Sequence, residues 1–276
     1  GGWGGGGGGE GWRGGGAPTG GAVRWVTGAA GGIGAATALA LAQDGADVAL
    51  VDLHWNDRPG NPSAAIRALG RQAVEIACDV GDLDKSEAAF AEAVSALGAI
   101  DILVTSAVYS DREFFYKADI KGFRKTIDVS LWGAFHFLRA TSRHLIDRQA
   151  PGSIVLVSSP HAHVPTPSCM AYNMAKAALD MMGKTAATEL LGKGIRVNMI
   201  YPGWTDTPGE RKFFTEETLR VASAALPMKR LMRPDEVARG VVFLCDPASE
   251  SITGTILSID GGTQLPWWSK RGTGEF

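Results

Sequence analysis

Seven short apolar runs, separated by helical patterns, constrain the fold of this chain more than any other feature. The runs are VRWVT (23–27), DVALV (47–51), AVEIA (73–77), DILV (101–104), SIVLV (153–157), RVNMI (196–200) and TILSI (255–259). Most are continuously apolar, which is typical of parallel strands covered by helices on both faces. The helical patterns lie at 33–43, 84–97, 117–147, 170–192 and 234–245. The alternation predicts an α/β protein with a doubly wound, mostly parallel sheet of about seven strands in three αβα layers.

The length of 276 residues suits one large domain, which we expect to span residues 22–265. The first twenty residues contain thirteen glycines, so segment 1–21 is predicted to be a flexible tail. A glycine/arginine tail that binds RNA is the alternative, but this segment has a single arginine. Residues 266–276 are predicted to form a C-terminal tail.

Charge and cysteine content exclude several classes of protein. With 27 basic and 29 acidic residues the net charge is −2, so no basic surface for nucleic acid or an anionic membrane is expected. No apolar stretch reaches the length of about 18 residues that a membrane span needs, and no signal-peptide pattern is visible. The three cysteines lack paired or metal-ligand spacing, and Cys78 and Cys245 lie in apolar runs. We expect a soluble, cytoplasmic protein without a metal site.

The stretch TGAAGGIG (27–34) directly follows the first run and opens the first helix. Its glycines Gly28, Gly32 and Gly34 have the spacing G-x-x-x-G-x-G. Glycine permits positive φ and a close approach of the backbone to a diphosphate. The helix N-terminus behind the turn supplies free N–H groups and the positive end of the helix dipole. This context predicts a dinucleotide-binding turn of the Rossmann type.

Asp52 closes the second run, 18 residues after Gly34. A carboxylate there accepts hydrogen bonds from both ribose hydroxyls of adenosine and repels a 2′-phosphate. No lysine or arginine adjoins it, and Arg58 is six residues further on. The sequence therefore favours NAD over NADP. The alternative interpretation of Asp52 is an ordinary turn aspartate.

The stretch AYNMAKAAL (171–179) places Tyr172 and Lys176 on one helix face. Ionising a phenol at pH 7 costs about 4 kcal/mol. A cation about 4 Å away, at an effective dielectric of about 20, contributes about 4 kcal/mol and offsets that cost. The lysine would therefore make the tyrosine a usable general base. The alternative is simple packing with both polar ends turned to solvent.

Together with CDV (78–80), VSS (157–159), RVNMIYPG (196–203) and TGTILSIDGG (253–262), these motifs resemble the classical short-chain dehydrogenase/reductase family over about residues 22–265. The resemblance implies hydride transfer between a nicotinamide cofactor and a secondary alcohol or carbonyl. It implies that Tyr172 is the general acid/base, that Lys176 also holds the nicotinamide ribose, and that Ser159 orients the substrate oxygen.

The resemblance further implies a cofactor site drawn from the whole chain. Asp79 would bind the adenine amine, with Val80 beside the base, and Thr207 the nicotinamide carboxamide or a phosphate. The implied cofactor-binding residues are Gly28, Ala30, Gly32, Ile33, Gly34, Asp52, Asp79, Val80, Ala107, Tyr172, Lys176, Pro202, Gly203, Thr205 and Thr207.

Two positions depart from the family pattern. Ser130 stands where the family has the asparagine of a catalytic tetrad, which holds a water in a proton relay through the lysine. Serine both donates and accepts but has a shorter reach, so we expect adapted or impaired activity. Thr105-Ser106-Ala107-Val108 replaces the usual Asn-Asn-Ala-Gly. Because Val108 adopts positive φ only at a cost, this loop must run differently or carry strain.

Three loops are expected to form the substrate wall: 108–117, 160–170 and the lid-sized insertion 204–228. Within them, the predicted substrate contacts are His161, His163 and Trp204. For each histidine the alternative is an ordinary loop residue.

SSPHAHVPTP and GTQLPWW are faintly similar to segments of bacterial glucose 1-dehydrogenases, which favours a sugar or polyol. The rivals are a 3-oxoacyl-thioester reductase and a non-catalytic NAD-binding protein. Analogy with the family predicts a homotetramer, with a dimer as the alternative.

Overall fold

The computed structural model describes residues 23–55 and 60–266, so the predicted tail 1–21, Arg58 and all but the first residue of the predicted tail 266–276 lie outside the described residues. Its seven-stranded sheet has the order β3-β2-β1-β4-β5-β6-β7, and every pairing is parallel. The strands are β1 (Val23–Thr27), β2 (Asp47–Asp52), β3 (Ala73–Ala77), β4 (Ile102–Thr105), β5 (Gly152–Val157), β6 (Ile195–Pro202) and β7 (Ile256–Ile259). The predicted doubly wound fold is confirmed.

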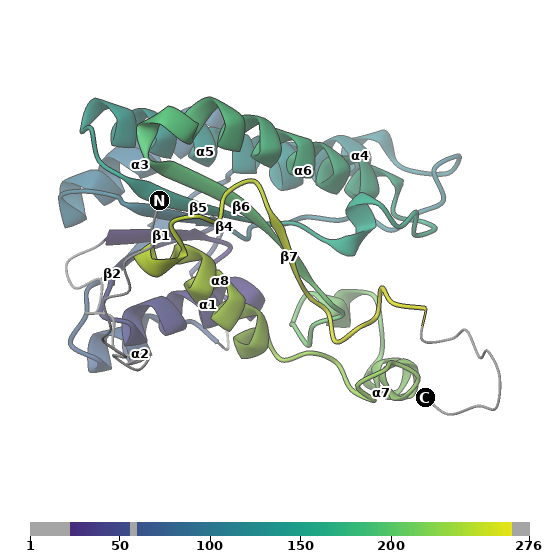
Figure 1. Ribbon diagram of the computed structural model, residues 1–276. Coiled ribbons are helices and arrows are strands. Elements are labelled where there is room, and N and C mark those ends of the chain that lie inside the picture. The colour runs from purple at the N-terminus through teal and green to yellow at the C-terminus, as the bar shows by residue number, and fades with distance from the viewer. Residues whose placement is uncertain (1–22, 56–59, 267–276) are drawn as a thin grey trace, which may run out of the picture.

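Helices cover both faces of the sheet, as Figure 1 shows. One face carries α3 (Leu83–Leu97), α4 (Ile120–Ile127), α5 (Gly133–Asp147) and α6 (Met170–Leu190). The opposite face carries α1 (Gly32–Gln43), α2 (Ser63–Ala68) and α8 (Pro234–Cys245). Short 3₁₀ turns lie at Pro160–Ala162, Leu191–Lys193, Glu210–Lys212 and Pro247–Ser249.

Most strand residues are apolar because the alternate side chains of the strands enter two separate cores. Trp25 of β1 packs on the α5 side against Phe137, with ring centroids 4.9 Å apart. Its neighbour Val26 enters the other core with Leu41 of α1 and Val241 of α8. All of these residues are buried, which stabilises both layers on the sheet.

The strand order reverses between β1 and β4, where Thr27 lies opposite Thr105. In open α/β sheets, ligands bind in the crevice beyond the carboxyl ends of the strands at such a reversal. The segments that follow β1, β4, β5 and β6 therefore meet at one edge of the sheet, and these segments contain most of the predicted site residues.

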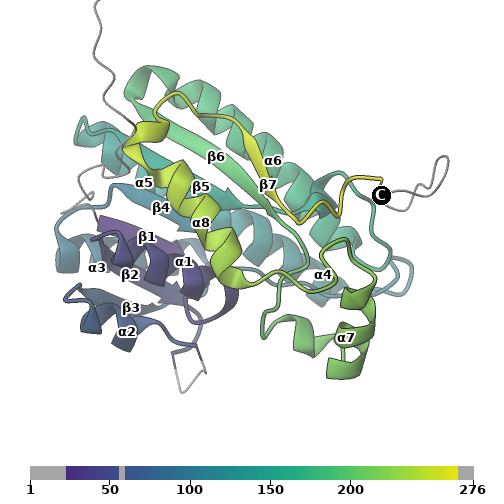
Figure 2. The ribbon, with the colours of Figure 1, turned by 60° about the horizontal axis from the view of Figure 1, so that its bottom comes forward.

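Three features differ from the sequence-based expectation. The predicted helix 117–147 is two α-helices joined by a π-helical turn, Asp128–Trp132. Helix α2 and helix α7 (Glu216–Ala224) were not predicted, and α7 stands apart from the three layers in Figure 2. Both helices are short, and α7 has a polar sequence with a single fully buried residue, Leu219, so its apolar periodicity is weak.

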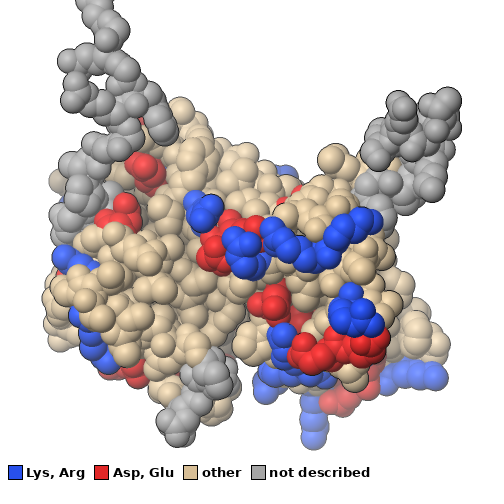
Figure 3. All heavy atoms as spheres, turned by 90° about the horizontal axis from the view of Figure 1, so that it is seen from below, with Lys and Arg blue, Asp and Glu red and all other residues tan. Residues whose placement is uncertain are grey.

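The cysteines, the hydropathy of the helices and the surface charges of the described residues bear on the predictions made from composition. All three cysteines are buried free thiols, and the described part of the chain contains no cluster of metal-binding side chains. Within the same residues, no helix has the length and apolar character to cross a membrane. Figure 3 shows lysines and arginines interspersed with acidic residues on the face that it displays.

Candidate active site

The glycine turn between β1 and α1 is shaped as the sequence predicts. Gly28 and Gly32 have positive φ, +67° and +55°. A Cβ on Gly34 would lie 2.1 Å from the carbonyl oxygen of Gly28, so only glycine fits there. No described side chain caps α1, which leaves its first N–H groups facing out of the turn. This glycine-lined cradle at a helix N-terminus fits a diphosphate.

Asp52 is the last residue of β2, and Asp79 and Val80 lie just after β3. Asp52 accepts a hydrogen bond from the N–H of Ala30 at 3.0 Å, so its carboxylate braces the glycine turn. Carboxylate oxygens accept more than one hydrogen bond, which is compatible with the ribose role. Asp79 accepts from the N–H of Gly81 at 3.1 Å. Val80 is buried, and a Cβ on Gly133 of α5 would lie 2.6 Å from its Cγ2.

The loop after β4 lies against the glycine turn. The N–H groups of Ser106 and Ala107 donate to the Thr27 hydroxyl at 3.1 and 3.2 Å. A Cβ on Gly28 would lie 2.7 Å from the nitrogen of Ala107. Val108 is not among the described residues with positive φ, so this loop runs differently from the family pattern and carries no such strain.

The segment after β6 reaches the same turn. A Cβ on Gly32 would lie 3.1 Å from Cγ2 of Thr207, although 175 positions separate them. Gly203 packs against the backbone of Asp260, where a Cβ would lie 2.7 Å from Cα. It follows directly on Pro202, the last residue of β6. The Thr205 hydroxyl donates to the Gly203 carbonyl at 2.8 Å, so this side chain is committed to its own backbone. Ile33 packs against the core on the α1 side.

Ser159, His161 and Tyr172 lie together beyond β5. Ser159 caps the 3₁₀ turn that follows it and is 8% exposed. The ring of His161 contacts that of Tyr172 edge-on, with centroids 5.3 Å apart. Burial raises the pKa of Tyr172 to about 12, while hydrogen bonding to Ser159 acts in the opposite direction. The phenol is therefore protonated at neutral pH in this structure.

His161 is held as a neutral ring. Nδ1 lies 3.1 Å from the side-chain oxygen of Asn173 on α6, and Nε2 lies 3.3 Å from the Thr166 hydroxyl. Burial is the main cause that lowers the pKa of His161. His163 points elsewhere: it is exposed and stacks on Tyr201, with ring centroids 5.4 Å apart. Of the two predicted histidines, only His161 is brought to Tyr172.

Lys176 lies one helical turn after Tyr172 and is 4% exposed. Its Nζ donates to the Val157 carbonyl at 2.7 Å and lies 5.5 Å from the centroid of the Tyr172 ring. Burial lowers the pKa of Lys176 to about 8. The lysine is thus adjacent to the tyrosine as predicted, but burial outweighs its attraction for a phenolate in this structure.

Ser130 lies in the π-helical turn between α4 and α5 and is 2% exposed. Its hydroxyl donates to the Tyr109 carbonyl at 2.7 Å and accepts from the Tyr109 N–H at 3.1 Å. Since a hydroxyl has one proton to donate, Ser130 is engaged in fixing the loop after β4. π-helical turns within helices occur often at functional sites.

The lid-sized insertion is joined to the loop after β4 by residues that the sequence did not indicate. Arg112 donates to Glu210 at 3.1 Å, and its guanidinium lies 3.9 Å from the ring centroid of Phe213. Glu210 also accepts from the indole N–H of Trp204 at 2.8 Å. Trp204, a predicted substrate contact, is therefore tied into this Arg112–Glu210 bridge.

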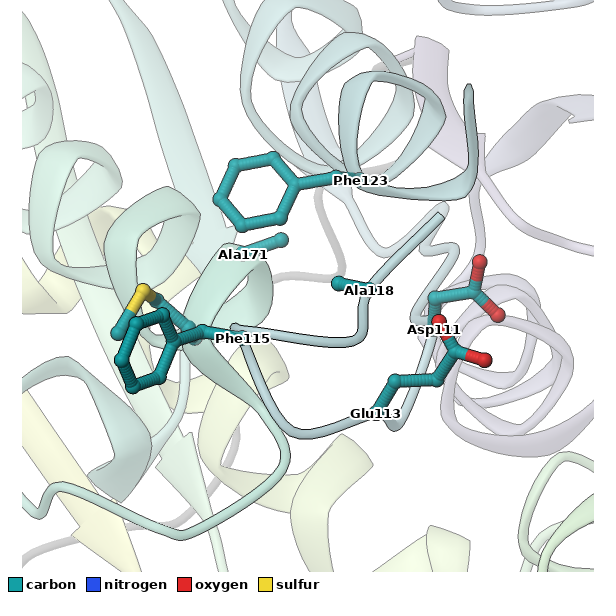
Figure 4. Close-up of a pocket in the computed structure, with 7 residues that line it drawn as sticks. Asp111, Glu113, Phe115, Ala118, Phe123 and Ala171 are labelled. Carbon is teal, nitrogen blue, oxygen red and sulfur yellow. The ribbon is translucent and has the colours of Figure 1, made fainter. Parts of the chain in front are cut away.

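A small pocket lies between the loop after β4, α4 and the first turn of α6. Figure 4 shows Phe115, Ala118, Phe123 and Ala171 on its apolar side and the carboxylates of Asp111 and Glu113 across from them. Ala171 is adjacent in sequence to Tyr172, so the pocket borders the candidate substrate site.

Comparisons with known proteins agree with this geometry. Residues 28–264 match a family model described as Enoyl-(Acyl carrier protein) reductase. The chain is 34% identical to cis-4-hydroxycyclohexanecarboxylate dehydrogenase of Sinomonas cyclohexanicum, over 87% of this chain and 95% of that protein. It is 32% identical to a glucose 1-dehydrogenase of Gluconobacter oxydans, over 87% and 91%.

A crystal structure of a short-chain type dehydrogenase/reductase from Mycobacterium marinum superposes with a TM-score of 0.81 at 29% identity, covering 90% of this chain and 97% of that one. With the glycine turn, the reversal of strand order and the Ser159–Tyr172–Lys176 group in place, the matches extend over nearly the whole catalytic fold. The chain therefore belongs to the short-chain dehydrogenase/reductase family and is an NAD(P)-dependent dehydrogenase that acts on CH–OH groups.

Proposed function

We propose that the protein is an NAD-dependent oxidoreductase that transfers hydride between the nicotinamide and a secondary alcohol or carbonyl of a small polar ring compound, with a sugar or polyol favoured. The observation that carries the proposal is the grouping of Ser159, Tyr172 and Lys176 beyond the carboxyl end of β5, at the same end of the parallel sheet as the glycine turn that follows β1. The side chains come from the loop after β5 and from α6.

In this proposal Tyr172 moves the proton at its phenolic oxygen and Ser159 orients the reacting oxygen of the substrate. When bound, the nicotinamide cofactor supplies or accepts the hydride. Because the pKa of Tyr172 is raised to about 12, the phenol is ready to act as the acid in carbonyl reduction at neutral pH. Alcohol oxidation needs the phenolate, so the charge on Lys176 has its main effect in that direction.

The glycine turn, Asp79, Val80, Ala107 and Thr207 would hold the cofactor. The preference for NAD rests on Asp52, whose carboxylate is held at the glycine turn by a hydrogen bond from the N–H of Ala30. The 2′-phosphate of NADP would lie close to this carboxylate, and the two negative charges would repel each other. Thr205 would act indirectly, since its hydroxyl is bonded to the Gly203 carbonyl.

The names of two relatives support a hydroxylated six-membered ring as substrate, namely cis-4-hydroxycyclohexanecarboxylate and glucose. A 3-oxoacyl-thioester reductase is the second candidate. The name of a third relative favours it, since the chain is 34% identical to a 3-oxoacyl-(acyl-carrier-protein) reductase of Thermotoga maritima, over 88% of this chain and 97% of that protein. A cofactor-binding protein without catalysis is the third, motivated by Ser130 and its bonds to Tyr109.

The test is NADH formation from NAD, with NADP in parallel, on a panel of sugars, polyols and hydroxycyclohexanecarboxylates, with an acetoacetyl thioester assayed in the reducing direction. Turnover of a ring alcohol that prefers NAD supports the proposal. A tenfold or larger preference for NADP in kcat/KM, or turnover of the thioester alone, contradicts it. Asp52→Ala is expected to weaken NAD use about tenfold by removing the ribose acceptor.

Removing the Arg112–Glu210 bridge is expected to loosen the substrate wall. Arg112→Ala takes away both the ion pair and the contact with Phe213, so we expect the KM of a turned-over substrate to rise about tenfold, with kcat changed less. Steady-state kinetics check this. Arg220→Ala is the matched control, because Arg220 pairs with Glu217 on the exposed surface of α7. Equal effects of the two variants would mean that the bridge does not shape the site.

The proposed homotetramer has support in exposed apolar side chains on α5 and α6. Phe135, Met174 and Met181 are 37%, 51% and 64% exposed. Apolar groups gathered on helices of a soluble fold indicate a protein contact. Light scattering of the full chain distinguishes a tetramer from the dimer or monomer.

A further inference from the structure

A buried carboxylate lies behind Lys176 and has no part in the site described so far. Asp180 follows Lys176 by one helical turn on α6 and is 8% exposed. One of its oxygens accepts from the Ser158 hydroxyl at 2.6 Å, and the other accepts from the Tyr201 hydroxyl. The three side chains join α6 to the residue that follows β5 and to β6.

Both hydroxyls are held as donors to the carboxylate. Burial and the Asp180 carboxylate both raise the pKa of Tyr201, so its hydroxyl keeps its proton. His163 stacks on the outer side of the Tyr201 ring. A carboxylate that accepts two such hydrogen bonds is stabilised in its charged form.

The charge of Asp180 acts on Lys176. Lys176 is buried, and its printed hydrogen bond is to a neutral carbonyl, that of Val157. Burial lowers its pKa, and among the described residues Asp180 is the charged group that opposes this. Among the described residues, the other titratable groups on this side are the phenols of Tyr172 and Tyr201 and the rings of His161 and His163. An ammonium in a dry interior is costly without a negative charge nearby.

We propose that Asp180 is a positioning residue: it supplies the buried negative charge that keeps Lys176 an ammonium ion, and Ser158 and Tyr201 fix its carboxylate for that purpose. The inference rests on the proposed function, because a charged Lys176 acts there on Tyr172 and the cofactor ribose. It assigns no contact with substrate or cofactor to Asp180 itself.

Asp180→Asn tests the proposal, because the amide keeps the size and one acceptor oxygen but removes the charge. Its NH₂ group would donate to the second hydroxyl, so the direction of that hydrogen bond is reversed. The Lys176 pKa, about 8 in the wild type, is expected to fall by about one to two units. The direct readout is a ¹³C NMR titration of ε-labelled lysine in the cofactor-free protein, with Lys176→Met identifying the resonance. An unchanged Lys176 titration in Asp180→Asn overturns the proposal.

The pH profile supplies the second readout. Loss of the Lys176 charge at lower pH should move the alkaline limb of kcat/KM to lower pH, with about tenfold less activity than wild type at pH 8 and less than about twofold at pH 6. Tyr201→Phe is the matched control, because it removes one hydroxyl and leaves the carboxylate. If Tyr201→Phe shifts the limb as far as Asp180→Asn does, the role is structural and the proposal fails.

Two outcomes, an inactive wild type and an Asp180→Asn variant that does not fold, need separate measurements. A wild type that turns over nothing in the panel overturns the proposed function, while the NMR titration still decides the role of Asp180. If Asp180→Asn does not fold, a stability cycle on Lys176→Met and Tyr201→Phe replaces it. Lys176→Met strands the carboxylate, so the loss of Tyr201 as its donor should then cost more stability than it does in the wild type. Additive effects in that cycle overturn the proposal.

Discussion

Tyr172→Phe is expected to lower turnover about 10³-fold, because it removes the phenolic oxygen that we propose to exchange a proton with the reacting group. The substitution keeps the ring that packs against His161, so the fold should be retained. The measurement is kcat for NADH formation, and for NADH consumption with the corresponding ketone. In the wild type, oxidation should rise with pH from 6 to 8 since it uses the phenolate, whereas reduction should not, since the pKa of Tyr172 lies near 12.

The control for this variant is cofactor binding, followed by NADH fluorescence, which should change less than about threefold. Tyr109→Phe is the matched control variant and should keep its turnover. The Ser130 hydroxyl bonds to the backbone of Tyr109 and not to the phenol that this substitution removes. A Tyr172→Phe protein with more than a tenth of wild-type turnover would show that another group moves the proton.

Gly34→Ala is expected to destabilise the protein by about 1–3 kcal/mol, because its Cβ would meet the Gly28 carbonyl and force the turn apart. The contact distance of 2.1 Å is too short for any adjustment of side chains alone. The cradle for the diphosphate would widen at the same time, so NADH affinity should fall about tenfold or more. Urea unfolding and NADH fluorescence give the two values.

Gly31→Ala is the internal comparison, three residues away in the same turn. Gly31 has an extended backbone with φ −172°, and a Cβ there meets no described atom within 4 Å. Its stability should stay within about 0.5 kcal/mol of the wild type. Equal stability of the two alanine variants would mean that the turn does not need glycine at residue 34.

The strands were predictable because the central ones, such as β1, β4 and β5, are buried on two faces, which leaves mostly apolar runs in the sequence. The predicted runs VRWVT (23–27) and AVEIA (73–77) match β1 and β3 at both ends, and the other strands differ by at most a few residues. The glycine turn was equally predictable from the sequence, since the positive φ of Gly28 and the close contact of Gly34 both require glycine.

Long-range side-chain pairs were not predictable. Arg112 and Glu210 are 98 positions apart, and a single arginine in a polar loop gives no signal of its partner. Asp180 could have been found, because it follows Lys176 at the spacing that places both on one helix face. Ser130 departs from the family pattern in the sequence, but the sequence does not indicate the π-helical turn from which its hydroxyl reaches the backbone of Tyr109.

The reversed order of the sheet also bears on how the chain is synthesised. β1 lies between β2 and β4, yet β2 and β3 are both made before β4. Until β4 leaves the ribosome, one edge of β1 is an apolar strand without a partner, and such edges promote aggregation. Every pairing in an all-parallel sheet closes a long loop, so folding is slow as well. A lower expression level, which reduces the concentration of chains with this edge exposed, should therefore increase the yield of folded protein.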